Sequence, residues 1–352
     1  MHRHQPRMAS KRHSLGTIGE FGLIRQLQRQ WPTSSPRVLK SIGDDAAILK
    51  TVSGQQLLLS TDTFVEGVHF DRAFQTLRDV GFRAGVANLS DIAAMGGQPL
   101  YLLVSLAVPT SVPAQHIRLL YRGIREACGS HRVALIGGDT SSSPRDIFLS
   151  LTIVGTIPSN CALTRSGAHV GDHLYVTGTL GDARAGLHIL QTRTRCPQQS
   201  RLSVPEKFLT QRHLRPTPRI GIGQILATRG MAHAAIDLSD GLSGDIGHIC
   251  DNSQVGVEIW ANAVPLSPHL HTFARNHHLD PVDFALRGGD DYELLFTARA
   301  RHHTHVMDLS RRTGVPIAWI GEIKPKHFGQ RLTSPQGRLH TLVQKSYRHF
   351  VA

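Results

Sequence analysis

Residues 57–70 read LLLSTDTFVEGVHF, three leucines followed by two hydroxyls, a carboxylate and, further on, an imidazole. An unbroken run of large aliphatic residues is typical of a strand that is buried on both faces. Polar residues that follow such a strand lie where the sheet opens into a crevice, which is a common position for a bound ligand. We therefore predict a strand that carries Ser60, Thr61 and Asp62 as ligands at its C-terminal tip.

Similar acidic turns recur along the chain, and two of them directly follow aliphatic runs. These turns are GGDT at 137–140, DLSDG at 237–241, IGDDA at 42–46 and GGDDYE at 288–293. A single Asp at the end of a strand is usually a turn former or a helix N-cap. Five such turns in one chain are harder to explain in that way, because clustered carboxylates repel one another unless cations hold them. The economical hypothesis is a site for several divalent metal ions.

The pattern of residues 76–95 predicts a helix with one inward-facing stripe. Steps of four and three place five residues on that stripe: Val80, Ala84, Ala87, Asp91 and Ala94. A carboxylate on the buried side of a helix is costly unless it is paired or bound to a metal. We expect Asp91 to be a ligand, and the alternative is a buried structural carboxylate.

The length and composition indicate an α/β (α+β) protein with two domains. The chain has 352 residues, of which 40% are hydrophobic, and expected strands and helices alternate throughout. We place a basic N-terminal extension at 1–18, a first domain at 19–158 and a second at 159–352. The longest apolar stretch, 100–108, is far shorter than the roughly 20 residues that a membrane helix needs, so we expect no role in a membrane.

The charge and the cysteines exclude other classes of protein. The formal net charge is +13, but the basic residues form short clusters without interleaved aromatic residues, which argues against specific nucleic-acid binding. A basic surface that attracts anionic metabolites is the simpler interpretation. Cys128, Cys161, Cys196 and Cys250 are widely spaced, which argues against a zinc site and against a disulfide framework. The basic N-terminus lacks the apolar segment of a secretory signal, so we expect a cytoplasmic protein.

Seven motifs resemble those of the thiamine-monophosphate kinases in order and spacing, from about residue 19 to the C-terminus. They are IGDDAA at 42–47, STD at 60–62 with HF at 69–70, NLSDIAAMG at 88–96, GGDT at 137–140, TRSGA at 164–168, DLSDGL at 237–242 and GGDDYEL at 288–294. The resemblance implies the fold of aminoimidazole ribonucleotide synthetase, selenophosphate synthetase and the hydrogenase maturation dehydratase. In that superfamily the N-terminal halves of two subunits form a barrel, so a homodimer is implied, with nucleotide bound in the cleft toward the second domain.

The same resemblance implies a set of site residues. The implied magnesium ligands are Asp44, Ser60, Thr61, Asp62, Asp91, Asp139, Asp237 and Asp240. The implied ATP contacts are Tyr121, Gly138, Asp139, Arg165 and Ser239, and the implied contacts to thiamine monophosphate are His69, Asp290 and Tyr347. Of these, Asp62, Asp240 and Arg165 are expected to be essential. The chain departs from the family at Asp290, where a glutamate is usual, and in the residues around Tyr347.

The implied reaction converts ATP and thiamine monophosphate into ADP and thiamine diphosphate by magnesium-assisted, direct in-line phosphoryl transfer. The attacking phosphate oxygen is already largely ionised at neutral pH, because the second pKa of a phosphomonoester is about 6. The reaction therefore needs cations that neutralise and align two phosphates rather than a general base. Many carboxylates without an obvious nucleophile–base pair suit this chemistry.

Two alternatives remain open from the sequence. The first is another ATP-dependent enzyme of the same superfamily that acts on a different small substrate. Selenophosphate synthetase needs a reactive residue near its N-terminus and the hydrogenase maturation enzyme a C-terminal cysteine, whereas the cysteines here begin at Cys128 and end at Cys250. The second alternative is a non-catalytic module that binds nucleotide or metal without turnover.

Overall fold

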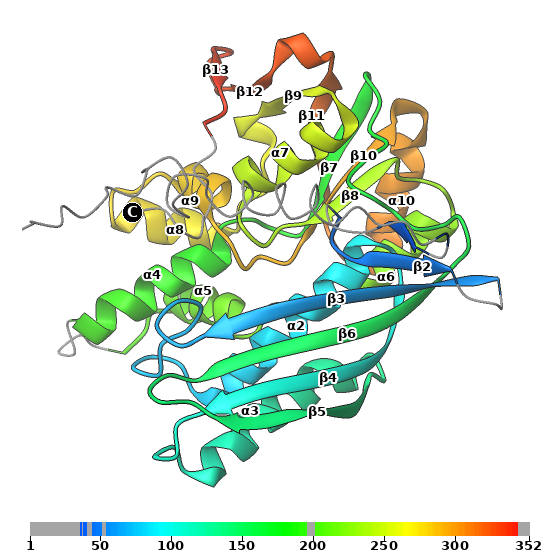
Figure 1. Cartoon of the computed structure of the whole chain (residues 1–352). Coiled ribbons are helices and arrows are strands. Elements are labelled where there is room, and N and C mark those ends of the chain that lie inside the picture. The colour runs from blue at the N-terminus through cyan, green and yellow to red at the C-terminus, as the bar shows by residue number, and fades with distance from the viewer. Residues whose placement is uncertain (1–35, 37, 41–43, 51–53, 196–200, 344–352) are drawn as a thin grey trace, which may run out of the picture.

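The computed structural model describes residues 36, 38–40, 44–50, 54–195 and 201–343. Within them the chain forms two β-sheets with helices packed between and around them, which confirms the predicted α/β class (Figure 1). The N-terminal extension and Tyr347 lie outside the described residues.

The first half is a six-stranded sheet with the order β1-β2-β3-β6-β4-β5. Its strands are β1 (Val38–Lys40), β2 (Ala47–Lys50), β3 (Gln55–Val65), β4 (Gln98–Val108), β5 (Ala134–Ser142) and β6 (Phe148–Pro158). Neighbouring strands are antiparallel except for the parallel pair β4 and β5. Helices α2 (Leu77–Ala94) and α3 (Ala114–Gly129) lie against one face of this sheet (Figure 1).

The polar residues of β3 and β5 lie within the strands and not at their tips, so that part of the sequence prediction is wrong. The antiparallel partner β6 pairs with β3 along its whole length, from Gln55 opposite Pro158 to Val65 opposite Phe148. This pairing keeps the backbone extended past Asp62. Because alternate residues of a strand face opposite sides, Ser60 and Asp62 share a face with the buried Leu58 and Phe64.

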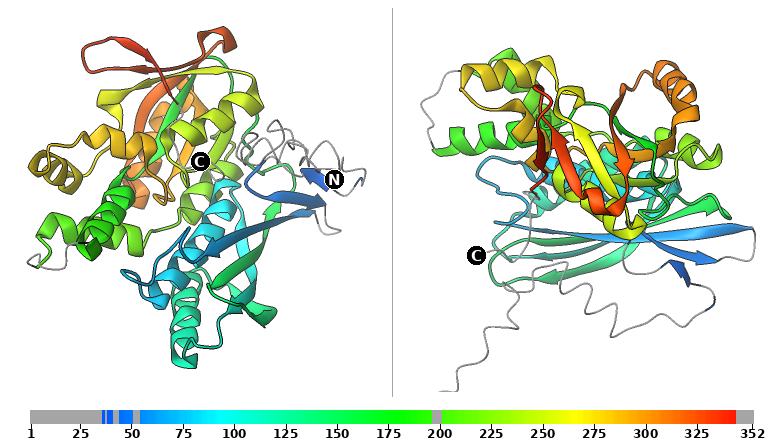
Figure 2. Two further views of the ribbon diagram at one scale, coloured as in Figure 1. Left: turned by 60° about the vertical axis from the view of Figure 1, so that its left-hand side comes forward. Right: turned by 90° about the horizontal axis from the view of Figure 1, so that it is seen from above.

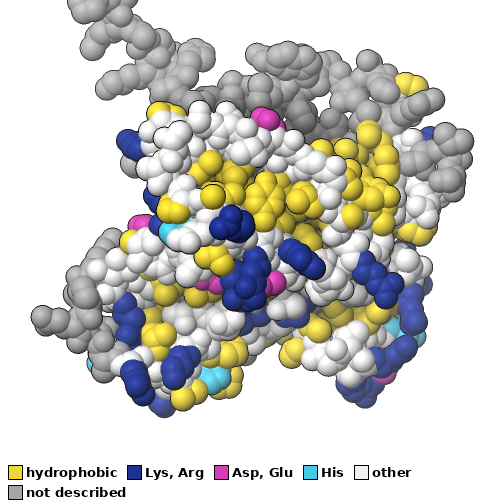
Figure 3. Space-filling view, turned by 90° about the horizontal axis from the view of Figure 1, so that it is seen from below, with side chains coloured by type: hydrophobic (Ala, Val, Ile, Leu, Met, Phe, Trp, Pro, Cys, Tyr) yellow, Lys and Arg dark blue, Asp and Glu magenta, His cyan; other side chains and the backbone are white. Residues whose placement is uncertain are grey.

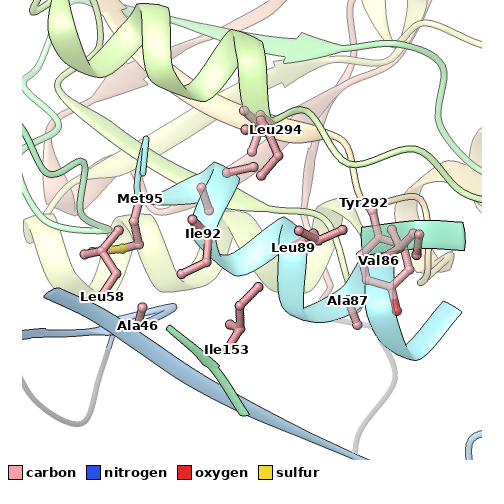
Figure 4. Packing of buried hydrophobic residues seen from close by; sticks show 14 of the residues in the cluster. Ala46, Leu58, Val86, Ala87, Leu89, Ile92, Met95, Ile153, Tyr292 and Leu294 are labelled. Atoms are coloured by element: carbon pink, nitrogen blue, oxygen red, sulfur yellow. The ribbon is translucent and has the colours of Figure 1, made fainter. Parts of the chain in front are cut away.

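Helix α2 is the central element, and it begins where the sequence predicts. Thr76 is its N-cap and accepts a hydrogen bond from the backbone N–H of Asp79. The predicted apolar stripe is buried, but the helix is buried on its other sides as well. Figure 4 shows Ile92 and Leu89 between Ile153 of the first sheet and Leu294 of the second half. Helix α2 therefore fills the space between the two halves of the chain, and most of its residues are buried.

Glycines allow α2 and α3 to approach each other closely. A Cβ atom on Gly81 would lie 2.0 Å from the carbonyl oxygen of Leu120, and one on Gly123 would lie 1.9 Å from that of Arg78. No side chain fits at such distances, so each helix presents a smooth surface to the backbone of the other.

The second half is a seven-stranded sheet with the order β13-β12-β9-β11-β7-β10-β8. Its strands are β7 (Asp172–Thr177), β8 (Ala234–Asp237), β9 (Gly256–Trp260), β10 (Leu294–Arg299), β11 (Ile317–Lys324), β12 (Gln330–Thr333) and β13 (Leu339–Thr341). Its helices are α4 (Asp182–Arg195), α5 (Val204–Leu214), α6 (Ile220–Thr228), α7 (Leu242–Ser253), α8 (Pro268–Asn276), α9 (Pro281–Arg287) and α10 (His303–Thr313). Figure 2 shows this half stacked on α2, on the side away from the first sheet. Asp237 ends β8 and so does lie at the tip of its strand, as predicted.

No helix of the described residues covers the opposite face of the first sheet. Strand β5 forms its edge and is exposed along its whole length, and Leu135 and Ile136 on it are 50% and 57% exposed. Tyr101 on β4 and Phe148 on β6 are also exposed. Seen from below, the side on which β5 lies in Figure 1, hydrophobic side chains form a continuous patch bordered by Lys and Arg (Figure 3). None of the described helices has the length and apolar character that crossing a bilayer requires.

The packing of α2 on α3 predicts that Gly123→Ala destabilises the fold. The new methyl group would overlap the backbone of α2, so we expect a loss of about 2–3 kcal/mol in the free energy of unfolding. Urea unfolding followed by circular dichroism measures it. Gly129→Ala is the matched control, because nothing lies within 4 Å of its Cβ position and alanine favours a helix. Equal stability of the two variants would contradict this description of the interface.

Candidate active site

Three carboxylates from distant parts of the chain meet between the two halves. They belong to Asp45 before β2, Asp91 on α2 and Asp237 at the end of β8, and one oxygen of each lies within 4.8 Å of the others. Ser60 on β3 donates a hydrogen bond to Asp91. We call Asp45, Asp91 and Asp237, together with the neighbouring Asp62, the carboxylate cluster. Because both halves contribute to it, the cluster exists only in the folded chain.

Asp62 points a free oxygen into this region. Its Oδ2 is fully buried and has no hydrogen-bond partner among the described residues. A buried carboxylate oxygen without a partner costs free energy, so the position favours a bound cation or a proton. Carboxylate and hydroxyl oxygens are the ligands that magnesium prefers, and the residues present therefore fit such an ion.

The charges of the cluster disturb its acid–base equilibria. Burial, and then repulsion by Asp45, raises the pKa of Asp62 to about 6 and that of Asp237 to about 8. Burial, and then repulsion by Asp62 and Asp237, raises the pKa of Asp91 well above its usual value. Without a cation these carboxylates hold protons near neutral pH, which is the behaviour expected of a metal-binding group of acids.

Arg165 supplies the nearest fixed positive charge. Its guanidinium makes two hydrogen bonds to the carboxylate of Asp45, at 2.7 and 3.1 Å. Its backbone N–H donates to Asp44 at 2.7 Å, and Lys40 Nζ lies 3.1 Å from the other oxygen of Asp44. The structure thus places Asp45 in the cluster, whereas the sequence prediction names Asp44. Adjacent residues point in different directions, and Asp44 is turned toward Lys40 and the backbone.

The turn that contains Ser239 and Asp240 lies beside the cluster and is held by a residue that the sequence analysis missed. Asp245 on α7 accepts hydrogen bonds from the backbone N–H groups of Asp240 and Gly241, at 3.2 and 3.0 Å. Burial, and then repulsion by Asp240 and Asp237, raises the pKa of Asp245 well above its usual value. The turn also packs on the late acidic turn, because Asp290 donates its backbone N–H to the carbonyl of Ser239 at 2.9 Å.

Arg83 joins His69 to Asp290. Its guanidinium donates to the carbonyl of His69 at 3.2 Å and to Asp290 Oδ2 at 2.5 Å, and it is almost fully buried. Tyr292 donates to the other oxygen of Asp290 at 2.9 Å, and His213 Nδ1 lies 3.7 Å from Oδ2. Burial is the largest single influence and alone would raise the pKa of Asp290, but the charge of Arg83 and the hydrogen bonds from Tyr292 and Arg83 act together against it, and the pKa is lowered. The two expected substrate contacts are therefore neighbours, and Asp290 is held as an anion.

Arg83 and His213 were not among the predicted site residues. Arg83 lies eight residues before Asp91 on α2, a little over two turns of helix. It is the one charged residue of the otherwise apolar stretch 80–87, and this is a signal that the sequence contains. Burial, and then the charge of Arg83, lowers the pKa of His213 to about 3, so this imidazole is neutral at physiological pH. Its place on α5 gives no comparable signal.

Four predicted residues lie away from the cluster in the single chain. Strand pairing places Asp139 opposite Ser105, Ser105 opposite Ser150, and Ser150 opposite Thr63. Asp139 and the preceding glycine at 138 are thus three strands from β3, or roughly 14 Å at about 4.8 Å per strand. The hydroxyl of Thr61 points to the uncovered face, where it donates to the carbonyl of Leu151 at 2.9 Å. Tyr121 on α3 packs against the core.

A buried ion-pair network secures the second half beside the site. Glu293 is fully buried and binds Arg219 through two hydrogen bonds of 2.5 and 2.6 Å and Arg212 through one of 2.9 Å. Burial would raise the pKa of Glu293, but the hydrogen bond and charge of Arg219 lower it. Because Glu293 follows the late acidic turn, this network fixes the position of Asp290 and Tyr292.

Comparison with known proteins agrees with the fold. The chain matches the models of the AIR synthase related protein, N-terminal domain, over residues 43–157 and C-terminal domain over residues 169–331. The thiamine-monophosphate kinase of Haemophilus influenzae is 36% identical over 336 residues, covering 95% of this chain and 98% of the relative. That of Escherichia coli K12 is 38% identical over 335 residues, covering 94% and 98%.

Solved structures give the same answer. The structure of AaThiL complexed with AMPPCP and TMP has a TM-score of 0.82 and 33% identity, covering 97% of this chain and 100% of that one. The thiamine-monophosphate kinase of Stenotrophomonas maltophilia K279a has a TM-score of 0.73 and 37% identity, covering 90% and 95%. Because relatives of this similarity align along nearly the whole length, the chain belongs to the thiamine-monophosphate kinase family.

Proposed function

We propose that this chain transfers the terminal phosphoryl group of ATP to thiamine monophosphate, giving thiamine diphosphate and ADP. The observation that carries the proposal is the carboxylate cluster, in which Asp45, Asp91 and Asp237 meet and the neighbouring Asp62 has a buried oxygen without a hydrogen-bond partner among the described residues. The family relatives support the substrate, and a related structure binds AMPPCP, an analogue of ATP, together with TMP. A coupled assay of ADP release, with thiamine monophosphate compared with free thiamine, tests the reaction and its acceptor.

We assign magnesium to the cluster. Asp45, Asp62, Asp91 and Asp237 would hold it, with Ser60 and Asp240 at the border. Bound magnesium neutralises and aligns the phosphates for in-line transfer. The support from the chain itself is electrostatic. The pKa values of Asp62, Asp91 and Asp237 are raised by burial and mutual repulsion, and a cation beside them would favour their ionised forms.

The chemistry requires little proton transfer from the protein. An oxygen of the acceptor phosphate, already ionised, forms a bond to the γ-phosphorus of ATP while the bond from that phosphorus to the bridging oxygen breaks, and ADP leaves. The main task of the residues is to position two anions. Arg165 is suited to the ATP side, since its planar guanidinium already makes a bidentate pair with Asp45 and can do the same with phosphate.

Thiamine monophosphate is assigned to the neighbouring pocket of His69 and Asp290. The thiazolium ring of thiamine is cationic, and the ionised Asp290 offers the opposite charge. Arg83 acts as a positioning residue, because it holds both the His69 backbone and the Asp290 carboxylate. The role expected for Tyr347 falls outside the described residues and stays a prediction.

A homodimer completes this proposal. The uncovered face of the first sheet and the exposed edge strand β5 carry apolar residues, and large apolar surfaces usually mark interfaces. Gly138 and Asp139 lie on that strand, so we assign them to a nucleotide site that a second copy completes.

A cytoplasmic location suits an enzyme that uses ATP, and Cys128, Cys161 and Cys250 are free thiols.

Asp62→Asn is expected to abolish turnover without unfolding the protein. The substitution keeps the shape of the side chain but removes the charge that faces the metal, so kcat should fall by about 100-fold or more. ADP release at saturating substrates measures this, and circular dichroism checks the fold. Asp71→Asn is the matched control on an exposed turn. Activity near the parent level in Asp62→Asn would refute the metal assignment.

His69→Ala and Asp290→Asn are expected to weaken binding of one substrate. Each should raise the KM for thiamine monophosphate by about tenfold, or roughly 1.4 kcal/mol, and leave the KM for ATP nearly unchanged. Asparagine is chosen at 290 because this residue has a positive φ of 64°, which asparagine tolerates. If the KM for ATP rose instead, the late acidic turn would belong to the nucleotide side.

Magnesium is expected to stabilise the protein more at pH 8 than at pH 6. The pKa values of Asp62 and Asp237, about 6 and about 8, exceed the ordinary value of 3.8, so the metal-free protein loses stability as pH rises from about 4 to about 8. Magnesium binds the ionised groups and reverses that loss. The thermal unfolding midpoint with and without magnesium at each pH measures the effect.

Asp237→Asn separates this effect from other influences of pH. The variant should show a smaller fall in midpoint between pH 6 and 8 and a smaller response to magnesium. Asp251→Asn, on the exposed side of α7, should behave like the parent protein. A magnesium response of the same size at both pH values would contradict the linkage.

A further inference from the structure

Two histidines and an aspartate converge on the second half, away from the carboxylate cluster. His169 lies in the segment before β7, Asp172 begins β7, and His233 directly precedes β8. The Nδ1 atoms of the two imidazoles are 3.2 Å apart, and His233 Nδ1 lies 2.8 Å from Asp172 Oδ2. One ligand atom of each residue lies within 4.8 Å of the other two.

We propose that His169, Asp172 and His233 bind a divalent transition metal ion such as Zn²⁺. Zinc binds histidine nitrogen at about 2.0–2.1 Å, so two nitrogens of a tetrahedral site lie about 3.3 Å apart, close to the distance found here. Two imidazole nitrogens that face each other at this distance need either a proton or a metal between them. Three protein ligands leave a fourth position for water, and the exposed His169 lets the ion enter from solvent.

The surroundings hold these ligands in place. The Asp172 side chain is only 4% exposed, and its Oδ2 also accepts the backbone N–H of His169 at 2.9 Å. His233 donates its own backbone N–H to the carbonyl of Thr297 on β10 at 2.8 Å. Gly167 packs so closely on His233 that a Cβ there would lie 2.6 Å from the His233 carbonyl oxygen. Such fixed second contacts orient metal ligands before the ion arrives.

Arg299 on β10 is expected to weaken metal binding. Its Nε donates to Nε2 of His233 at 3.1 Å, and this bond requires Nε2 to be free of a proton. The neutral ring then carries its proton on Nδ1, where it occupies the position of the ion. Metal binding moves that proton to Nε2 and releases Arg299, whose side chain is at the surface. Removal of Arg299 should therefore tighten binding.

The ligand type separates this site from the carboxylate cluster. Imidazole nitrogens favour zinc, nickel and copper, whereas magnesium prefers oxygen ligands.

The two histidines are close in sequence to residues of the candidate active site. His169 follows Arg165 by four residues, and His233 precedes Asp237 by four. The backbone N–H of Ala235 also donates to the carbonyl of Thr164 at 3.0 Å. An ion here would tie the segment that carries Arg165 to the strand that carries Asp237.

The test is calorimetric titration of the full-length protein with ZnCl₂ in excess magnesium, with the visible absorption of bound Co²⁺ as a second readout. The parent protein should show one tight site. His169→Ala, a change at the surface, should weaken that site by about tenfold or more, as should His233→Ala. Arg299→Ala should tighten it several-fold. His271→Ala, on the exposed side of α8, is the matched control and should leave the site unchanged.

The variants also define what would overturn the proposal. Zinc binding of parent strength in His169→Ala would place the ion on other histidines of the chain. Weaker binding in Arg299→Ala would show that the proton on His233 does not compete with the metal. The first result refutes this site and the second refutes the competing role of Arg299. Both leave the proposed kinase activity untouched, since that activity is measured with magnesium alone.

Discussion

The gathering of carboxylates between the two halves is the constraint on which the rest of the structure depends. Burying several acids in one place is unfavourable for each of them, and the raised pKa values of Asp62, Asp91 and Asp237 express that cost. The fold accepts it because the carboxylates belong to elements that are rigid for other reasons. Strand β3 is paired along its length, α2 is enclosed, and β8 is hydrogen-bonded in the second sheet. The proposed divalent cation would offset the mutual repulsion of these carboxylates.

Helix α2 connects the carboxylate cluster to both halves of the molecule through its packing contacts. It contacts the first sheet, α3 and the second half, and its glycines and alanines allow close approach on each side. On this apolar helix Arg83 and Asp91 face functional neighbours, the first at Asp290 and the second at the carboxylate cluster. A shift of the helix would therefore disturb both substrate positions together. The two halves are coupled through one packed element and not through a flexible connection.

Oppositely charged partners balance the remaining acids of the late turn. Glu293 binds Arg212 and Arg219, and Asp290 binds Arg83. Glu293 and Arg83 are almost fully buried, whereas the Asp290 side chain is 26% exposed. Breaking such a buried pair by removing one partner is commonly worth about 3–5 kcal/mol, because the other charge stays buried and unpaired. These pairs help to hold the backbone of the late turn against the Ser239 turn, so ion pairs set the geometry of the region proposed to bind thiamine monophosphate.

The sequence alone determined the α/β class, the span of α2 and the identity of most of the acids. The spacing of apolar residues and the composition predict these features directly. The inward position of Asp91 and the strand-end position of Asp237 are examples. Only the tertiary structure decided that Asp45 and not Asp44 joins the cluster, because two adjacent side chains differ only in direction. Likewise, strand order placed Asp139 three strands from β3, and no local pattern encodes which strands become neighbours. Arg83 became a site residue only when Asp290, more than 200 positions away, was brought to its guanidinium. Which residues meet is a property of long-range packing, and a linear pattern does not contain it.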